Sequence, residues 1–213
     1  MSIDTTTVLP DAIYDQLRAS ILSQHDAPGS AITESVVALR FGVARPTARL
    51  AIERLVVDGL LRREPHHAAR VPVLGHDDIA DLYYNRAIVE AEAVIALAAL
   101  STVPLSAVTA NNAIATATDF ARHDIDFHRA LVEAQPSPRL TRMHSLLMGE
   151  IELCIGQVQV AQLLSARDIA RQHQGILDAI LTGDSALAAR LTAAHIAGAR
   201  DRLLHNLDRT QHG

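Results

Sequence analysis

Four side chains in the C-terminal half of the chain have types and a spacing that suit a divalent metal ion. Asp124 and His128 are four residues apart, so on a helix they project from the same face. His173 and His195 each fall in the apolar stripe of a predicted helix, where an imidazole faces the protein interior. Three imidazoles and one carboxylate form a ligand set that divalent transition metals accept.

The last two of these histidines can be compared by their positions along the chain. His173 is ten residues before Gly183, which interrupts the helical pattern, and His195 is twelve residues after it. In an antiparallel hairpin their heights then differ by about 3 Å, at a rise of ~1.5 Å per residue, so the imidazoles can meet. The spacing leaves a second interpretation open, in which these are ordinary core histidines and Asp124 caps a helix or pairs with a cation. Four other histidines fit no cluster and are assigned to the surface: His123, His144, His205 and His212.

Helical periodicity dominates the region that must position these residues, and no stretch there alternates as a strand does. Pro104, Pro138 and Gly183 are among the residues that interrupt the pattern. We predict six helices, at residues 77–100, 104–116, 119–135, 138–163, 166–182 and 185–209. The short connections between them favour an antiparallel bundle.

A different arrangement is predicted before this bundle. Three helices are expected, at residues 11–24, 34–40 and 45–58. Thr33 is a suitable N-cap for the second helix, and Gly42 lies in the tight turn between the second and the third. Two short strand candidates follow and would form a hairpin, at residues 60–63 and 70–73. This order predicts a winged helix-turn-helix.

The arginines are concentrated where such a motif would contact DNA. The chain as a whole has a net charge of −5, yet residues 38–70 hold seven arginines and only three acidic residues. Arg45 and Arg49 share one face of the third helix, in the N-terminal half that reaches base edges in the major groove. An ordinary solvated arginine face is the alternative interpretation of this pattern.

The composition supports a mainly α fold. Hydrophobic residues make up 49% of the chain and aromatic residues only 3%, which favours packed helices. A single cysteine, Cys154, excludes an internal disulfide. The chain starts without the pattern of a secretory signal, and its longest apolar run, residues 93–100, is far shorter than the ~20 residues of a spanning helix. We therefore expect a soluble, cytoplasmic protein with no membrane partner.

The segment ITESVVALRFGVARPTARLAIERLVVDGLLRREP resembles the winged helix of the GntR superfamily of bacterial regulators. The matching positions are Ile32, Glu34, Ala38, Gly42, Val43, Arg45, Arg49, Ala51, Leu55, Gly59 and Leu60. The resemblance implies double-stranded operator DNA as a partner, with candidate contacts at Arg45, Thr47, Arg49, Arg40 and Arg70. The wing tip departs from the family pattern, because residues 66–69 read HHAA where a glycine is usual.

The rest of the chain is similar to the FCD sensor domain of the FadR subfamily. Arg86 and Glu90 match its first motif, DIDFHRALVEA (124–134) its second, and RQHQGILDAILTGDSALAARLTAAH (171–195) its third. In metal-containing members, the matching positions hold the metal, which implies Asp124, His128, His173 and His195 as ligands here. Six sensor helices are typical of the VanR-like group.

The predicted function is therefore that of a transcription regulator and not of an enzyme. Residues 1–74 would bind DNA, and residues 75–213 would sense a small carboxylate and form a homodimer. The carboxylate would bind a divalent ion, with Zn, Ni or Mn expected, and Arg86 as a second anchor. Its binding would release a repressor from the operator. Two alternatives stay open: a metalloenzyme that uses the same residues, and a regulator whose metal is purely structural.

Overall fold

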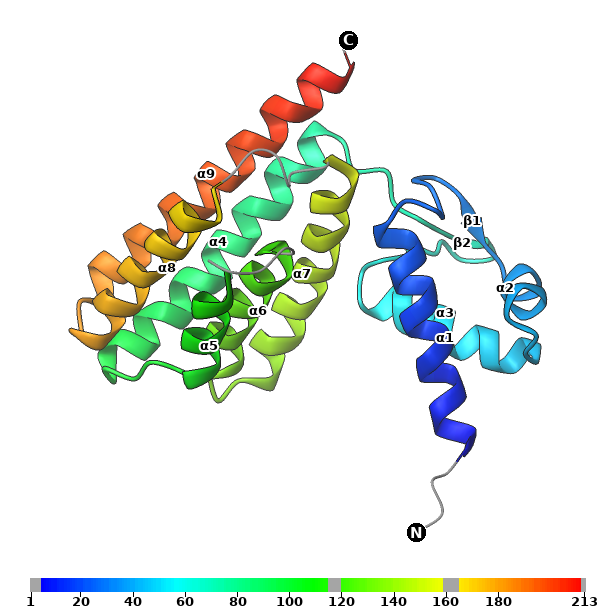
Figure 1. Ribbon diagram of the computed structural model, residues 1–213, viewed down its shortest axis with the longest axis horizontal. Helices are drawn as coiled ribbons and strands as arrows, with labels where there is room; N and C mark the ends of the chain where they lie inside the picture. The colour runs from blue at the N-terminus through cyan, green and yellow to red at the C-terminus, as the bar shows by residue number, and fades with distance from the viewer. Residues whose placement is uncertain (1–4, 115–119, 159–164, 212–213) are drawn as a thin grey trace. The chain divides into compact units, whose positions relative to one another are not determined.

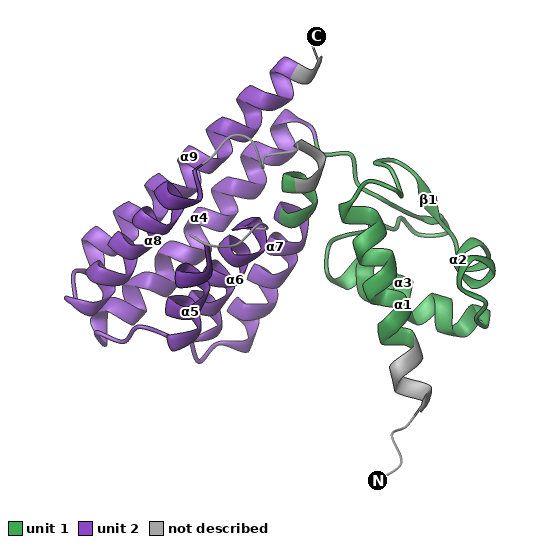
Figure 2. Ribbon diagram, viewed as in Figure 1, with its two compact units in different colours: residues 1–74, 152–157 green, residues 75–151, 158–213 purple. Residues whose placement is uncertain are grey.

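The computed structural model describes residues 5–114, 120–158 and 165–211. The chain divides into two compact units, shown in Figure 2. One contains residues 1–74 together with 152–157, and the other contains residues 75–151 and 158–213. Each unit is described by itself below.

The N-terminal unit is built from three helices and a small antiparallel sheet. Its elements are α1 (Thr5–Leu22), β1 (Ala31–Ile32), α2 (Glu34–Phe41), α3 (Arg45–Val57) and β2 (Ala69–Arg70). The apolar stripes expected from the sequence form its core, since Leu17 of α1 and both Ile52 and Leu55 of α3 are fully buried. The three predicted helices are therefore confirmed, although α1 begins earlier than expected and includes Pro10.

The turn between α2 and α3 follows from local chemistry. Thr33 caps α2, because its hydroxyl accepts a hydrogen bond from the amide of Val36. Gly42 ends this helix with φ 65°, a left-handed conformation that a residue without a Cβ adopts at little cost. Ala44 precedes α3 and provides no side-chain cap for it. The first turn of α3 thus presents uncapped backbone amides beside Arg45.

The wing differs from the predicted hairpin in which segments pair. β2 pairs with β1, with Ala31 opposite Arg70, and residues 60–63 contribute only an isolated bridge from Arg62 to Arg70. The sequence analysis missed β1, because a strand of two residues has no alternation to detect. At the wing tip, His66 has φ 65°, in the left-handed region that glycine usually occupies.

The second unit is helical throughout the part that the structure describes (Figure 1). Its helices are α4 (His76–Ala99), α5 (Leu105–Ile114), α6 (Phe120–Glu133), α7 (Pro138–Val158), α8 (Ala166–Leu181) and α9 (Ser185–Gln211), of which residues 152–157 of α7 are grouped with the N-terminal unit. Six helices were predicted in this region, and each corresponds to one of these within a few residues. The predicted ends at residues 116, 119 and 163 lie outside the described residues.

The core of the second unit determines which side chains can meet inside it. α4 and α9 share the most extensive helix contact, and the hydrophobic cluster between helices includes Val94, Phe127, Leu131, Ile176 and Ile180. These residues come from α4, α6 and α8, so the polar residues adjacent to them on the same faces are also directed inward. No helix in the described part of the chain combines the length and the apolar character that membrane crossing requires.

Candidate metal centre

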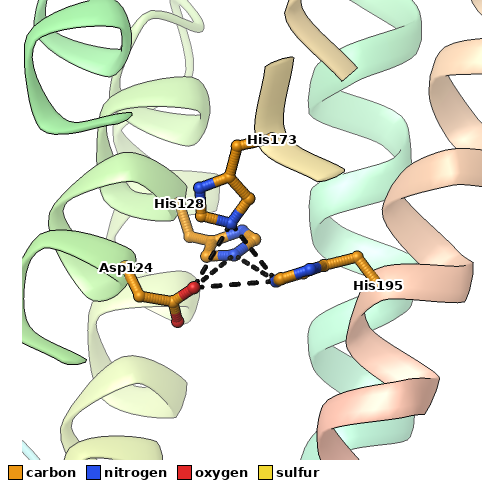
Figure 3. A group of neighbouring side chains, drawn as sticks. All are labelled: Asp124, His128, His173 and His195. Atoms are coloured by element: carbon orange, nitrogen blue, oxygen red, sulfur yellow. Dashed lines mark hydrogen bonds and ion pairs between the residues drawn. The ribbon is translucent and has the colours of Figure 1, made fainter. Parts of the chain in front are cut away.

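The four residues singled out by their spacing converge in the second unit (Figure 3). The Nε2 atom of His195 lies 3.1 Å from Nε2 of His128 and 3.3 Å from Nε2 of His173. The Oδ1 atom of Asp124 lies 3.2 Å from His173 Nε2, 3.7 Å from His195 Nε2 and 3.9 Å from His128 Nε2. All four potential ligand atoms are within 4.8 Å of one another.

Three helices bring these atoms together. Asp124 and His128 are one turn apart on α6, and His173 and His195 face each other from α8 and α9. Gly183 turns the chain between those two helices with φ 76°, and the carboxylate of Asp184 accepts from the amide of Leu187 to cap α9. The predicted meeting of the two imidazoles across this hairpin is confirmed.

Neighbouring side chains orient two of the three imidazoles. Nδ1 of His128 donates to Oε2 of Glu90 at 2.6 Å, and Nδ1 of His195 donates to Oε1 of Gln172 at 2.8 Å. A carboxylate oxygen and an amide oxygen are acceptors only, so each imidazole carries its proton on Nδ1. The Nε2 atoms therefore carry lone pairs that face the interior of the cluster.

This arrangement fits a metal ion better than it fits a network of hydrogen bonds. Two lone-pair nitrogens, His128 Nε2 and His195 Nε2, are 3.1 Å apart with no proton between them, which is repulsive unless a cation lies nearby. Ligand atoms that are each about 2.0–2.2 Å from one zinc ion are about 3.3–3.6 Å apart in a tetrahedron. Five of the six distances, from 3.1 to 3.9 Å, are close to that range, and the sixth, between His128 and His173, is within 4.8 Å. The carboxylate–histidine contact of Glu90 is also typical of metal sites.

The charge states of the cluster at neutral pH favour the binding of a cation. Burial lowers the pKa of His128 to about 4, and burial followed by the charge of His128 lowers the pKa of His195 well below its usual value. Burial raises the pKa of Asp124, but the hydrogen bond with His173 and the nearby imidazoles outweigh it and hold that pKa far below its ordinary value. At neutral pH, the cluster thus contains uncharged His128 and His195 and an ionised Asp124.

Glu90 is the main feature of the site that the sequence analysis missed. It is fully buried. Its carboxylate oxygens accept hydrogen bonds from Nε of Arg86 at 2.7 Å, Nδ1 of His128 at 2.6 Å and Nε2 of His144 at 2.9 Å. Burial raises its pKa, but Arg86 and His128 more than compensate, so Glu90 stays ionised. The surface assignment of His144 is wrong, since that side chain is only 2% exposed. The spacing of four between Arg86 and Glu90 was the available signal for this pair.

The predicted DNA-contacting residues occupy different environments in the N-terminal unit. Arg45 is exposed, with no hydrogen-bond or ion-pair partner among the described residues, and Thr47 is partly exposed. Arg49 is exposed and pairs with Glu53 at 2.7 Å. Arg40 donates to Asp26 and to Ser20, both at 2.8 Å, and Arg70 donates to the carbonyl of Gly29 at 2.9 Å. Arg40 and Arg70 therefore also have hydrogen-bond partners within the protein.

Family models match both units of the chain. The model for bacterial regulatory proteins of the gntR family matches residues 9–71, and the FCD domain model matches residues 81–198, more than half of the chain. BphR of Paraburkholderia xenovorans (strain LB400), an HTH-type transcriptional regulator, is 25% identical over 202 residues, which cover 88% of this chain and 82% of that protein. NanR of Enterobacter sp. (strain 638), an HTH-type transcriptional repressor, is 25% identical over 214 residues, with the same two coverages of 88% and 82%.

Solved structures show the same fold. A GntR transcriptional regulator from Rhodococcus sp. RHA1 superimposes with a TM-score of 0.75 at 23% identity, covering 92% of this chain and 97% of that one. E. coli McbR/YncC superimposes with a TM-score of 0.68 at 17% identity, covering 96% and 99%.

Together, the helix-turn-helix, the helical second unit and these matches define a DNA-binding transcriptional regulator. The chain belongs to the gntR family of bacterial regulatory proteins and carries an FCD domain. The matched family and relatives are regulators and not enzymes, so the metalloenzyme alternative is set aside.

Proposed function

We propose that this regulator is a metal-dependent repressor that a small carboxylate releases from its operator. Residues 1–74 are assigned to DNA binding and residues 75–213 to sensing and dimerisation. The observation that carries the proposal is the cluster of Asp124, His128, His173 and His195, whose donor atoms lie within 4.8 Å of one another inside the FCD domain.

The four side chains suit a divalent ion that still has coordination positions open to a further ligand. Such an ion, when bound, supplies one or two coordination positions beyond the four protein ligands to an anionic oxygen. Glu90 and Gln172 fix the orientation of two imidazoles and so limit how far the donor atoms can rearrange. Arg86, buried near this cluster, supplies a guanidinium that pairs well with a carboxylate.

The DNA-binding part of the proposal relies on α3. Arg45 and Arg49 are exposed in its N-terminal half, the part of a recognition helix that meets base edges. The side chains of the ion pair between Arg49 and Glu53 are 61% and 42% exposed, so the pair can exchange for a contact with a base at little cost. The uncapped amides in the first turn of α3 are suited to a backbone phosphate. Arg40 and Arg70 would contact phosphates at the edges of this surface.

The position of the cluster among three helices explains how effector binding would change the sensor domain. Its ligands come from α6, α8 and α9, so occupancy of the site biases the relative positions of these helices. A carboxylate that binds one arrangement better than another shifts the population toward it. In a dimer, this shift would change the spacing between two DNA-binding units and weaken operator binding. NanR, whose name describes a repressor, supports the assignment of this regulator as a repressor.

The proposal is tested by operator binding. The operator would first be isolated by selection of bound genomic DNA fragments, and binding would then be followed by fluorescence anisotropy with added Zn, Ni or Mn and a panel of small carboxylates. We expect at least one acid to weaken operator binding in the metal-loaded protein and to have no effect after chelation. Release that persists after chelation, or operator binding that no acid affects, would favour a metal with a purely structural role or no metal at all.

A further inference from the structure

Arg202, on α9, has two buried N–H donors without an acceptor among the described residues. The two donors are Nε and Nη2. Burial lowers the pKa of this guanidinium, while Tyr83, Asp124 and Asp201 offset the effect only in part. A buried donor without an acceptor costs free energy, and for a charged group the cost is larger. Such a group in a native fold points to a missing anion.

The backbone of α9 makes room for this guanidinium. Arg202 extends back along its own helix, as helical side chains do, and reaches the level of Gly198. A Cβ at residue 198 would lie 3.3 Å from Nη1 of Arg202 and 3.7 Å from Nη2. The absence of a side chain there lets the guanidinium lie against the helix and keep its unpaired N–H groups inside the unit.

Arg202 extends toward the part of α4 that contains Tyr83 and precedes Arg86. α4 and α9 are antiparallel, because the hydroxyl of Ser185 at the start of α9 donates to the carbonyl of Ile95 near the end of α4. The C-terminal half of α9 therefore lies beside the N-terminal half of α4, which contains Tyr83 and Arg86. The two guanidiniums share neighbours, since the charges of Tyr83 and Asp124 act on both.

Arg86 also has an unpaired donor. Its Nε donates to Glu90, but its Nη2 is buried without an acceptor among the described residues, although the side chain is only 1% exposed. Two arginines with buried, unpaired N–H groups thus lie close enough to a metal ligand, Asp124, for its charge to act on both. Guanidiniums bind carboxylate and phosphate groups through paired hydrogen bonds of this kind.

The charges around the cluster indicate the class of ligand. Arg86 is balanced by Glu90, Asp201 pairs with Arg200, and Asp124 offsets Arg202, so a divalent ion would leave two positive charges uncompensated. A monocarboxylate neutralises only one of them, whereas a ligand with two anionic groups neutralises both. Uncompensated charge in a buried site is costly, so the dianion is favoured.

We propose that Arg202 and Arg86 form an anion subsite beside the metal cluster, and that the effector is a small dianion with one anionic group at the cluster and the other at these arginines. This inference rests on the proposed metal-dependent sensing and names the class of its ligand. The second group is a carboxylate or a phosphate, because each offers two oxygens to a guanidinium. Dianion here means an acid with two anionic groups, of which a phosphate adds about one further charge at pH ~7.

Matched acids test the inference on the full-length, metal-loaded protein. Malate differs from lactate by one added carboxylate, and phosphoglycolate differs from glycolate by one added phosphate. Isothermal titration calorimetry should give a Kd for at least one dianion that is about tenfold or more below that of its monoanionic partner. Whichever pair shows the larger ratio identifies the second group as carboxylate or phosphate. Equal affinities within both pairs, or no binding of either dianion, would overturn the dianion assignment.

Arg202→Gln tests the residue itself, with Arg190→Gln as the control on an exposed arginine of the same helix. Arg202→Gln should remove the preference for the dianion and leave the weaker affinity for the monoanion and the metal content unchanged. Its ligand-free Tm should be at or above that of wild type, because two buried N–H donors without an acceptor are removed. A lower Tm, or an unchanged dianion preference, would show that Arg202 has a structural role and would overturn the subsite.

Failure of this inference can be told apart from failure of the proposed function. If wild type takes up no metal, the sensing proposal fails together with the subsite. If metal binds and monoanions bind as well as dianions do, only the subsite and the ligand class are wrong.

Discussion

Glu90 shows how single residues hold the candidate metal centre in place. Its two oxygens contact an arginine and two imidazoles, and one of these imidazoles, on His128, belongs to the metal cluster. A buried carboxylate with this many donors does two tasks: it fixes the tautomer and direction of His128, and it neutralises Arg86.

Glu90→Gln should therefore weaken both the site and the fold. The variant leaves Arg86 buried without its counter-charge, which should lower the free energy of unfolding by about 3 kcal/mol. It also removes the carboxylate that orients His128, so metal affinity should fall by about 10–100-fold. Metal titration with a competing chelator and urea denaturation would measure the two effects. The control is Glu92→Gln, an exposed position on the same helix, and equal behaviour of the two variants would contradict the role of Glu90.

The buried histidines also predict how the stability of the metal-free protein depends on pH. Burial lowers the pKa of His128 to about 4, whereas an unfolded histidine titrates near pH ~6.5. Between these values the unfolded chain binds a proton that the folded chain does not, so stability falls as the pH drops through this range. The depressed pKa values of Asp124 and Glu90 act in the same direction at lower pH.

Urea denaturation of metal-free protein across this range would measure the effect. His205→Gln is the control at an exposed histidine and should show the same decrease as wild type. A free energy of unfolding that stays constant from pH ~7 to pH ~5 would contradict the burial of neutral imidazoles.

Among individual residues, the sequence predicted the four members of the metal cluster but not the residues that support them. Asp124 and His128 share a helix face, and the positions of His173 and His195 relative to Gly183 could be compared directly. His144 and Gln172 gave no such signal, because their roles depend on which helices pack together. Arg202 is one of many arginines in the chain, and only its burial distinguishes it.

Helices were predicted more reliably than the wing, for a physical reason. Long amphipathic helices repeat their apolar positions over several turns, and caps such as Thr33 and Gly42 mark their ends. β1 has two residues, so nothing repeats, and its pairing with β2 is decided by tertiary structure. The sequence therefore predicted a wing in this region but assigned the wrong segment as the main partner of β2.

The third helix supports a direct prediction. Arg45→Ala and Arg49→Ala should each weaken specific operator binding by about 1–3 kcal/mol, if each arginine contacts a guanine through two hydrogen bonds. Both side chains are exposed, so folding should be unaffected. Anisotropy titrations and thermal melts would be run beside Arg190→Ala, an exposed arginine of α9. Wild-type operator affinity in both α3 variants would show that α3 does not read the DNA.

For the whole molecule, tight operator binding implies more than one DNA-binding unit. A single winged helix makes few base contacts, and pairs of half-sites are the usual solution for helix-turn-helix proteins. We therefore predict a homodimer whose mass by light scattering is about twice the 22.9 kDa of the chain. A monomer that still protects a palindromic site at low concentration would contradict this prediction.

Elemental analysis tests whether one divalent ion ties α6, α8 and α9 together in the FCD domain. Wild type, His173→Ala and His195→Ala would be refolded with Zn, Ni or Mn and dialysed, with His205→Ala as a control that keeps all four ligands. We expect one ion per chain in wild type and in the control, and almost none in the two ligand variants, because the remaining side chains bind the ion weakly. Stoichiometric metal in all four proteins, or no metal in wild type, would contradict it.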